Sequence, residues 1–275
     1  MPRPLSLAHL SALALSPPDL ITHAAAAGFD AVGLRLRPVT AAEPAHDLIG
    51  DAALMRATRA ALRATGIAVA DVEFLRLGPD LDPAGLAPFL AAGAELGARR
   101  VIAAPYDPDP ARLRDRLADL AARAAAHGLE VALEFFPWTP AAADLAAGWA
   151  LVRDAPANVG LLVDALHFDR SASSHALLAR LPAARLALVH LCDAPVAPPY
   201  DTAALLHCAR AARLPPGEGA IDLARFLRAL PAATPIGVEV PNPARLAALG
   251  PAGFLARLHD RARAVLAAGA EPGPA

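Results

Sequence analysis

Short aliphatic runs alternate with longer Ala-, Leu- and Arg-rich segments along almost the whole chain. The longer segments have the 3.6-residue period of amphipathic helices. This alternation is typical of repeated βα units, in which successive strands pair in parallel and helices cover them. Eight units can be counted in the 275 residues. The sequence therefore predicts an α/β fold, a (β/α)₈ barrel, as a single domain over residues 1–275.

The boundaries of the eight units follow from the same pattern. Strands are expected over Leu5–Leu10, Ala31–Leu36, Ala68–Phe74, Arg100–Ala104, Glu130–Phe135, Gly160–Leu166, Leu186–Leu191 and Ile236–Val240. Helices are expected over Pro18–Ala27, Ala52–Thr65, Pro83–Leu96, Pro110–His127, Pro140–Arg153, Ser174–Arg180, Leu223–Leu230 and Pro251–Ala268.

Polar residues followed by proline predict helix N-caps at Asp82-Pro83, Asp109-Pro110 and Thr139-Pro140. Left-handed C-caps are expected at Gly28, Gly66, Gly97 and Gly128. The two longest loops, Arg37–Gly50 and Ala194–Ile221, both follow strands, which is where such barrels place their active sites. The Pro/Gly-rich tail Gly269–Ala275 is expected to fray.

Composition excludes several functions. The net charge is −2 without a basic block, which argues against a nucleic-acid partner. All 25 basic residues are arginines, and Schiff-base chemistry, pyridoxal phosphate attachment and the Walker motif each need a lysine. No apolar run approaches the ~20 residues that span a bilayer. Two cysteines, Cys192 and Cys208, are too few for a disulfide framework, so a cytoplasmic protein is expected.

Ionisable residues interrupt the last four strands near their C-terminal ends. These strands read VALEFFP, GLLVDALHF, ALVHLCDAP and PIGVEVPN, and the interrupting residues are Glu134, Asp164, His190 and Glu239. Charged groups are costly inside a parallel strand unless they are paired or bind a metal. A single strand-end Glu or His is usually a surface or salt-bridged residue, but four successive strands with the same feature predict a shared site at the mouth of the barrel.

Three carboxylates and one imidazole gathered at one mouth would repel one another unless a cation neutralised them. Oxygen-rich ligand sets suit Mn²⁺ or Mg²⁺, and the imidazole also allows Co²⁺ or Zn²⁺. We expect a divalent metal, with Mn²⁺ ranked first.

These motifs resemble the sugar phosphate isomerase/epimerase family of the xylose-isomerase-like TIM barrels, a superfamily that also holds inosose dehydratases, 3-dehydroshikimate dehydratases and apurinic endonucleases. The resemblance covers about residues 5 to 265. It is carried by the order Glu, Asp-x-x-His, His-x-x-Asp, Glu, present as Glu134, Asp164-Ala-Leu-His167, His190-Leu-Cys-Asp193 and Glu239, and by the loop Pro216-Gly217-Glu218-Gly219-Ala220-Ile221-Asp222.

The resemblance implies that Glu134, Asp164, His190 and Glu239 are metal ligands. It also implies that His167 contacts the substrate or supports a ligand. The family's ketose 3-epimerases have an Arg six residues after the strand-seven histidine, whereas this chain has Val196. Arg210 and Arg213 are both candidates for the missing cation.

Such a site supports proton abstraction next to a carbonyl, with the metal polarising the carbonyl and stabilising the developing enediolate. Glu134 and Glu239 are the candidate acid and base. Arg35, Arg210 and Arg213 are candidates to bind a carboxylate or phosphate of the substrate, although solvated surface is an equally good interpretation. Further substrate contacts are expected from Glu73 and Glu218, and a supporting role beside His190 or an Arg is expected for Asp193.

Four functions compete. The first is a metal-dependent isomerase or epimerase of a sugar, sugar acid or cyclitol, and the second is a lyase that dehydrates a keto-cyclitol or a 3-dehydroshikimate-like substrate. The third is a non-catalytic sugar-binding barrel. The fourth is a metal-dependent repair nuclease, which the absence of further His and Asp ligands and of a basic surface disfavours. A homo-oligomer is left open.

Overall fold

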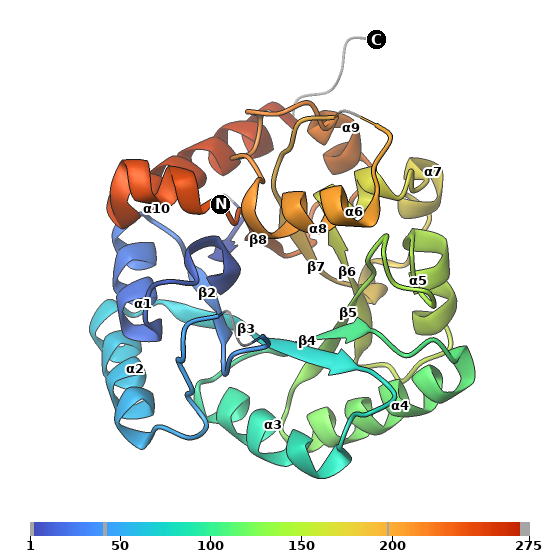
Figure 1. The fold of residues 1–275 in the computed structure, drawn as a ribbon, viewed down its shortest axis with the longest axis horizontal. Coiled ribbons are helices and arrows are strands. Elements are labelled where there is room, and N and C mark those ends of the chain that lie inside the picture. Colours follow the sequence, from blue (N-terminus) through green and yellow to red (C-terminus); the bar gives the residue numbers. More distant parts are fainter. Residues whose placement is uncertain (1–2, 41–42, 197, 270–275) are drawn as a thin grey trace.

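Eight parallel strands form a closed barrel in the computed structural model, which describes residues 3–40, 43–196 and 198–269 (Figure 1). Each strand pairs with the next in sequence, and β8 pairs with β1. The strands are β1 (Leu5–Leu7), β2 (Ala31–Arg35), β3 (Ala68–Leu77), β4 (Arg100–Pro105), β5 (Glu130–Glu134), β6 (Val159–Asp164), β7 (Leu186–Leu191) and β8 (Ile236–Val238). The predicted (β/α)₈ barrel is confirmed.

Most of the helices form an outer ring around the barrel (Figure 1). The helices are α1 (Pro17–Ala26), α2 (Ala52–Thr65), α3 (Leu86–Glu95), α4 (Pro110–Ala126), α5 (Leu145–Val152), α6 (Ala165–Arg170), α7 (His175–Leu178), α8 (Thr202–Ala211), α9 (Leu223–Arg228) and α10 (Pro243–Gly269). Three 3₁₀ turns lie at His9–Ala12, Pro83–Gly85 and Ala183–Arg185. In the part of the chain that is described, no helix combines the length and the apolar character needed to cross a membrane.

Local sequence signals explain several element ends. Asp109 caps α4 as predicted, because its Oδ1 accepts hydrogen bonds from the backbone N–H groups of Ala111 and Arg112. The four glycines expected to end helices, Gly28, Gly66, Gly97 and Gly128, all have positive φ. Of the tail that was expected to fray, Gly269 ends α10, and residues 270–275 lie outside the described residues.

Other boundary predictions were wrong. The helix expected from Pro140 begins at Leu145, because Asp144 caps it, while the Thr139 hydroxyl donates to Phe136 O and Ala142 O within a turn. The first strand ends at Leu7 and is followed by a 3₁₀ turn.

The longer corrections concern three segments. The stretch expected as a loop over Ala194–Ile221 contains α8, which Asp201 caps through the Ala204 N–H. Strand β3 continues to Leu77 instead of ending at Phe74. The last helical segment starts at Pro243 and is kinked at Gly250.

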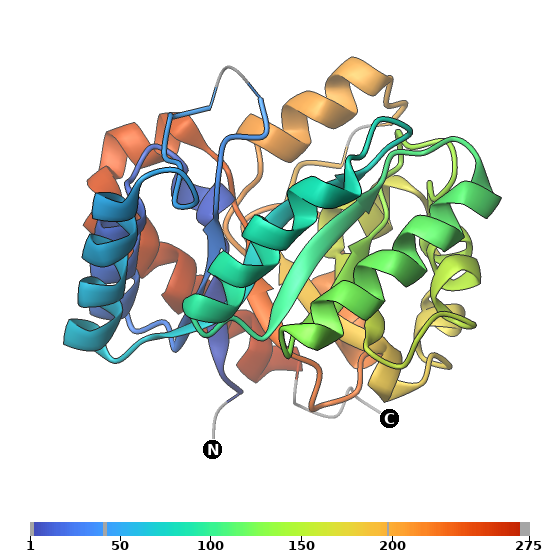
Figure 2. The same ribbon diagram turned by 90° about the horizontal axis from the view of Figure 1, so that it is seen from below.

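The core has two layers. The larger layer lies between the strands and the surrounding helices, and a smaller cluster fills the barrel interior with Ile102, Ala132, Leu162 and Leu188. Figure 2 shows that α8 crosses one end of the barrel, on the same side as the loop that precedes α2. This end is the mouth at the carboxyl ends of the strands.

Candidate metal centre

Three of the four predicted ligands lie one layer above the interior cluster. Side chains on a strand alternate between its two faces, so residues two apart point the same way. Ala132, Leu162 and Leu188 point into the barrel. Two positions further along the same strands stand the residues Glu134, Asp164 and His190. The packed apolar layer therefore forms the floor of the site.

Sheet register brings these side chains together. Asp164 and His190 are partners on the adjacent strands β6 and β7. Glu239 directly follows β8, whose Gly237 pairs with His190. One ligand atom from each of Glu134, Asp164, His190 and Glu239 lies within 4.8 Å of every other, and all four residues are buried. The structure thus brings the four predicted ligands into one cluster.

Asp164 has two roles in this geometry. Its Oδ1 accepts hydrogen bonds from the backbone N–H groups of Leu166 (2.8 Å) and His167 (3.1 Å), which makes it the N-cap of α6. These bonds fix the carboxylate and leave Oδ2 facing the cluster.

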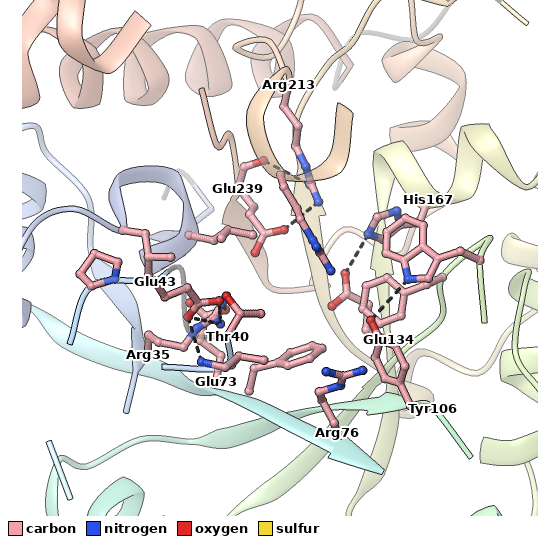
Figure 3. A pocket seen from close by; sticks show the side chains of 18 residues that line it. Arg35, Thr40, Glu43, Glu73, Arg76, Tyr106, Glu134, His167, Arg213 and Glu239 are labelled. Carbon is pink, nitrogen blue, oxygen red and sulfur yellow. Dashed lines mark hydrogen bonds and ion pairs between the residues drawn. The ribbon is translucent and has the colours of Figure 1, made fainter. Parts of the chain in front are cut away.

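Arg213 inserts its guanidinium into the same cluster (Figure 3). Its Nη1 lies 2.5 Å from Asp164 Oδ2, and its Nη2 lies 3.0 Å from Glu239 Oε2. The side chain is only 2% exposed. Its Nε donates to Ala209 O, and its carbonyl oxygen accepts from Asn242 Nδ2, so both ends of the residue are fixed.

Burial and neighbouring charges both shift the pKa values of the cluster residues. Burial raises the pKa of Glu134 well above its ordinary value, and the negative charge of Glu239 raises it further. Burial would lower the pKa of His190, but the negative charges of Glu239, Glu134 and Asp164 outweigh burial and raise it to about 10. Burial also disfavours the Glu239 carboxylate, yet the positive charges of His190 and Arg213 hold the pKa of Glu239 well below its ordinary value.

The donor set fits a divalent cation. Among the described residues, Glu134 Oε1 and His190 Nδ1 are buried polar atoms without a hydrogen-bond partner. Such atoms are costly unless something binds them. His190 Nδ1 lies 3.4 Å from Glu239 Oε1. Three carboxylates and one imidazole are the ligand chemistry of Mn²⁺, Mg²⁺, Co²⁺ or Zn²⁺ sites.

A pocket of about 330 Å³ opens above the cluster. Glu134, Glu239 and Arg213 line its inner end. One wall is aromatic: Phe136 stacks on Trp138 with ring centroids 5.1 Å apart, and both rings contact His167, at 4.8 and 5.1 Å.

His167 faces the cluster from α6. Its Nε2 lies 3.5 Å from Glu134 Oε1, and burial lowers its pKa to about 4. The ring is therefore neutral near pH 7 and can donate to, or accept from, a ligand beside Glu134. Its predicted substrate contact stays a prediction.

Arg35 and Glu73 line the pocket as predicted candidates, but they are paired with each other at 3.6 Å. Arg35 also binds Glu43 at 3.2 Å. Burial raises the pKa of Glu73 to about 7, although the Arg35 charge opposes the shift. The positive charge of Arg35 is thus largely neutralised within the protein.

Arg210 and Arg213, the two candidates for the cation missing at Val196, lie in different places. Val196 itself is exposed, and the guanidinium inside the cluster belongs to Arg213. Arg210 stays exposed on α8, where it lines the pocket.

The structure does not bring Glu218 into this pocket. Its carboxylate binds Arg245 at 2.6 Å and Arg257 at 2.7 Å, both from α10. Asp193 likewise accepts backbone N–H bonds from Gly217 and Ile221, so it shapes the Pro-Gly-Glu-Gly loop, and its predicted role beside His190 or an Arg stays a prediction.

Three further residues of this region did not emerge from the sequence. Asp71 lies two positions before Glu73 on β3, and burial raises its pKa to about 6. Arg76 and Tyr106 line the pocket from the ends of β3 and β4. The alternation in AVADVEFLRL could have indicated Asp71, because residues 71 and 73 share a face.

Comparisons with known proteins agree with the fold. The sequence profile of the xylose isomerase-like TIM barrel family matches residues 21–258. A 3-dehydroshikimate dehydratase of Pseudomonas aeruginosa is 35% identical over 138 residues, which are 49% of this chain and 21% of that protein. The chain therefore matches about a fifth of this relative's length.

Solved structures share the barrel. The IolI protein, solved with a bound zinc atom, is 19% identical with a TM-score of 0.74, and the match covers 98% of this chain and 100% of that chain. The 3-keto-D-glucoside 4-epimerase of E. coli is 17% identical with a TM-score of 0.68, over 94% of this chain and 100% of that chain. At these identities the likeness concerns the fold.

Proposed function

The chain belongs to the xylose isomerase-like TIM barrel family, and from this premise we propose that it is a divalent-metal-dependent isomerase or epimerase of a sugar, sugar acid or cyclitol. One observation carries the proposal: four buried ligand-type side chains meet within 4.8 Å at the inner end of a pocket large enough for a small molecule. A cytoplasmic location stays a prediction from composition.

Glu134, Asp164, His190 and Glu239 would hold the metal, with Mn²⁺ as the proposed ion and Zn²⁺ suggested by the IolI structure. When bound, the metal would supply Lewis-acid polarisation of a carbonyl. Glu134 and Glu239 would remove and return the proton on the neighbouring carbon. Both line the pocket, Glu134 from the end of β5 and Glu239 from the position directly after β8, so they can approach a substrate from two sides.

The surrounding residues support this chemistry. His167, beside Glu134, would bind a substrate hydroxyl, and the Phe136 and Trp138 rings would exclude water from the reacting face. Arg213 would hold Asp164 and Glu239 in place.

A second candidate is dehydration, in which a hydroxyl leaves from the carbon next to the deprotonated one. The 35% identity to a 3-dehydroshikimate dehydratase favours it. Both reactions begin with the same proton abstraction and use the same side chains.

Deuterium exchange tests the shared step. The Mn²⁺-loaded protein would be incubated in D₂O with ketoses, inososes and 3-dehydroshikimate, and exchange next to the carbonyl followed by NMR. We expect exchange with at least one compound, and a fall of about 10²–10⁴-fold in Glu239→Gln. Glu95→Gln, on the exposed side of α3, is the matched control.

The product separates the candidates. A new ultraviolet chromophore indicates dehydration, whereas a new sugar or cyclitol isomer without a chromophore indicates isomerisation or epimerisation. Ligand affinity that Glu239→Gln leaves unchanged, with no exchange in any compound, would instead indicate a non-catalytic binding barrel.

A further inference from the structure

Arginines and carboxylates surround the pocket in equal number. The lining arginines are Arg35, Arg76, Arg210 and Arg213, and the lining carboxylates are Glu43, Glu73, Glu134 and Glu239. Arg35 and Arg213 form ion pairs with carboxylates of the protein. Arg76 and Arg210 therefore carry the positive charge that is still available to a ligand.

Arg76 is exposed at the end of β3 and stacks on an aromatic ring. Its guanidinium carbon lies 4.2 Å from the centroid of the Tyr106 ring, within the range of a cation–π contact. No ion pair to Arg76 is found among residues 3–40, 43–196 and 198–269. A guanidinium stacked by its face keeps the N–H groups at its edge free to donate.

The sheet fixes both members of this stack. Arg76 is the register partner of Ala104 on β4, and the Tyr106 N–H donates to Leu77 O at 3.0 Å. Arg210, in contrast, projects from α8 without a ring contact or ion pair among the described residues. Of the two available arginines, Arg76 is the one whose position is set before a ligand arrives, which lowers the entropic cost of binding.

An aromatic wall connects this stack to the ligand cluster (Figure 3). The Trp138 Nε1–H donates to the Tyr106 hydroxyl at 3.4 Å, and the Tyr106 ring lies 6.2 Å from Phe136. The wall ends at His167, which contacts Glu134. A ligand lying along it would meet a guanidinium at one end and the carboxylate cluster at the other.

We propose that Arg76, stacked on Tyr106, binds a carboxylate of the substrate and so selects an acidic substrate over its neutral analogue. The orientation, with the carbonyl of the substrate at Glu134 and Glu239, rests on the proposed function. Arg76 matches a carboxylate because a single guanidinium binds both oxygens and neutralises one charge. A phosphate monoester carries up to two charges and would leave one unmatched on this wall.

Calorimetry with matched ligands tests the proposal. D-Gluconate would be compared with D-glucitol, and D-glucuronate with D-glucose, on the chelated and the Mn²⁺-loaded protein. A charge-assisted hydrogen bond predicts roughly tenfold to hundredfold tighter binding of each acid. In Arg76→Gln the ratio of the neutral ligand's Kd to the acid's Kd should fall below about threefold, and Arg76→Lys should keep part of this preference. Arg114→Gln, on the exposed surface of α4, should keep the full ratio.

Several results would overturn the proposal. They are equal affinity for acid and neutral ligand in the wild type, no binding of either acid, or a preference that Arg76→Gln leaves unchanged. If D-glucitol 6-phosphate binds more tightly than D-gluconate, the group that Arg76 selects is a phosphate and not a carboxylate. Failure of the proposed function gives another result. In that case the Arg76-dependent preference for acids persists on the chelated protein, but metal uptake and deuterium exchange are absent.

Discussion

Replacing Arg213 by methionine tests the electrostatics on which the site depends. The guanidinium contacts Asp164 Oδ2 at 2.5 Å and Glu239 Oε2 at 3.0 Å and is almost fully buried. Methionine keeps an unbranched apolar chain but removes the charge and the donors. Two buried carboxylates are then left with His190 as their remaining cationic neighbour in the cluster.

The expected cost is large. Removing one partner of a buried ion pair typically destabilises a protein by about 3–5 kcal/mol, because the other charge stays buried without compensation. With a shift of about 2–4 °C per kcal/mol for a domain of this size, the melting temperature should fall by roughly 6–20 °C. Protonation of a carboxylate relieves the uncompensated charge, so the loss should be larger at pH 8 than at pH 5.

Thermal denaturation followed by circular dichroism, in the presence of a chelator, measures the loss. Arg210→Met is the matched control, because Arg210 lies three residues earlier and is exposed; its unfolding free energy should stay within about 0.5 kcal/mol of the wild type. Mn²⁺ should raise the melting temperature of Arg213→Met more than that of the wild type, since a bound cation supplies the missing positive charge. Equal melting temperatures of the two variants would refute the reasoning.

Three further predictions follow from the described contacts. Calorimetry in buffers of different ionisation enthalpy should show release of at least one proton on metal uptake at pH 7, because the pKa of His190 is raised to about 10 and the imidazole binds a metal without its extra proton; release of none would contradict this. The raised pKa of His190, about 10 against an ordinary 6.5, stabilises the metal-free protein fully below pH 6.5, and this contribution is lost as the pH rises through 10. The melting temperature should therefore fall between pH 7 and pH 10, and less steeply in His190→Asn; parallel curves would argue against a charged imidazole. Gly219→Ala should cost about 1–3 kcal/mol in urea denaturation, because its Cβ would lie 2.5 Å from Ala194 O, while Gly253→Ala, in open helix, should not destabilise the protein.

The strand-end cluster could be predicted from the sequence because its signal is local. Glu134, Asp164 and His190 interrupt apolar strands, and a buried charge in such a strand needs a partner. Parallel pairing then places successive strand ends at one mouth, whatever the loops do. The fold and these positions follow from strand periodicity and topology alone.

The loops carry no comparable signal, and the predictions for them were less accurate. Helix α8 lies within a stretch expected to be a loop, so the sequence could not show that Arg213 turns inward while Arg210 stays outside. Glu218 binds arginines of α10, about 30 to 40 residues later in the chain. Its orientation depends on how the last helix packs, which no local pattern encodes.

Arg76 was missed for a related reason. Strand β3 was expected to end at Phe74, where its apolar alternation weakens, but β4 pairs with it up to Leu77. The extension turns Arg76 toward the pocket and onto Tyr106. Pairing between strands, and not the propensity of either segment, determines this part of the site.

Charge compensation connects Arg213 with the proposed metal. Without a metal, Arg213 and the protonated imidazole of His190 lie beside the Asp164 and Glu239 carboxylates, and burial raises the pKa of Glu134 well above its ordinary value. A divalent cation that displaces the proton of His190 adds two positive charges and removes one. Without Arg213, the metal-free site keeps His190 as its cation beside both carboxylates, so a bound divalent cation compensates more negative charge than it does in the wild type. Arg213 therefore stabilises the carboxylates of the cluster before the metal binds.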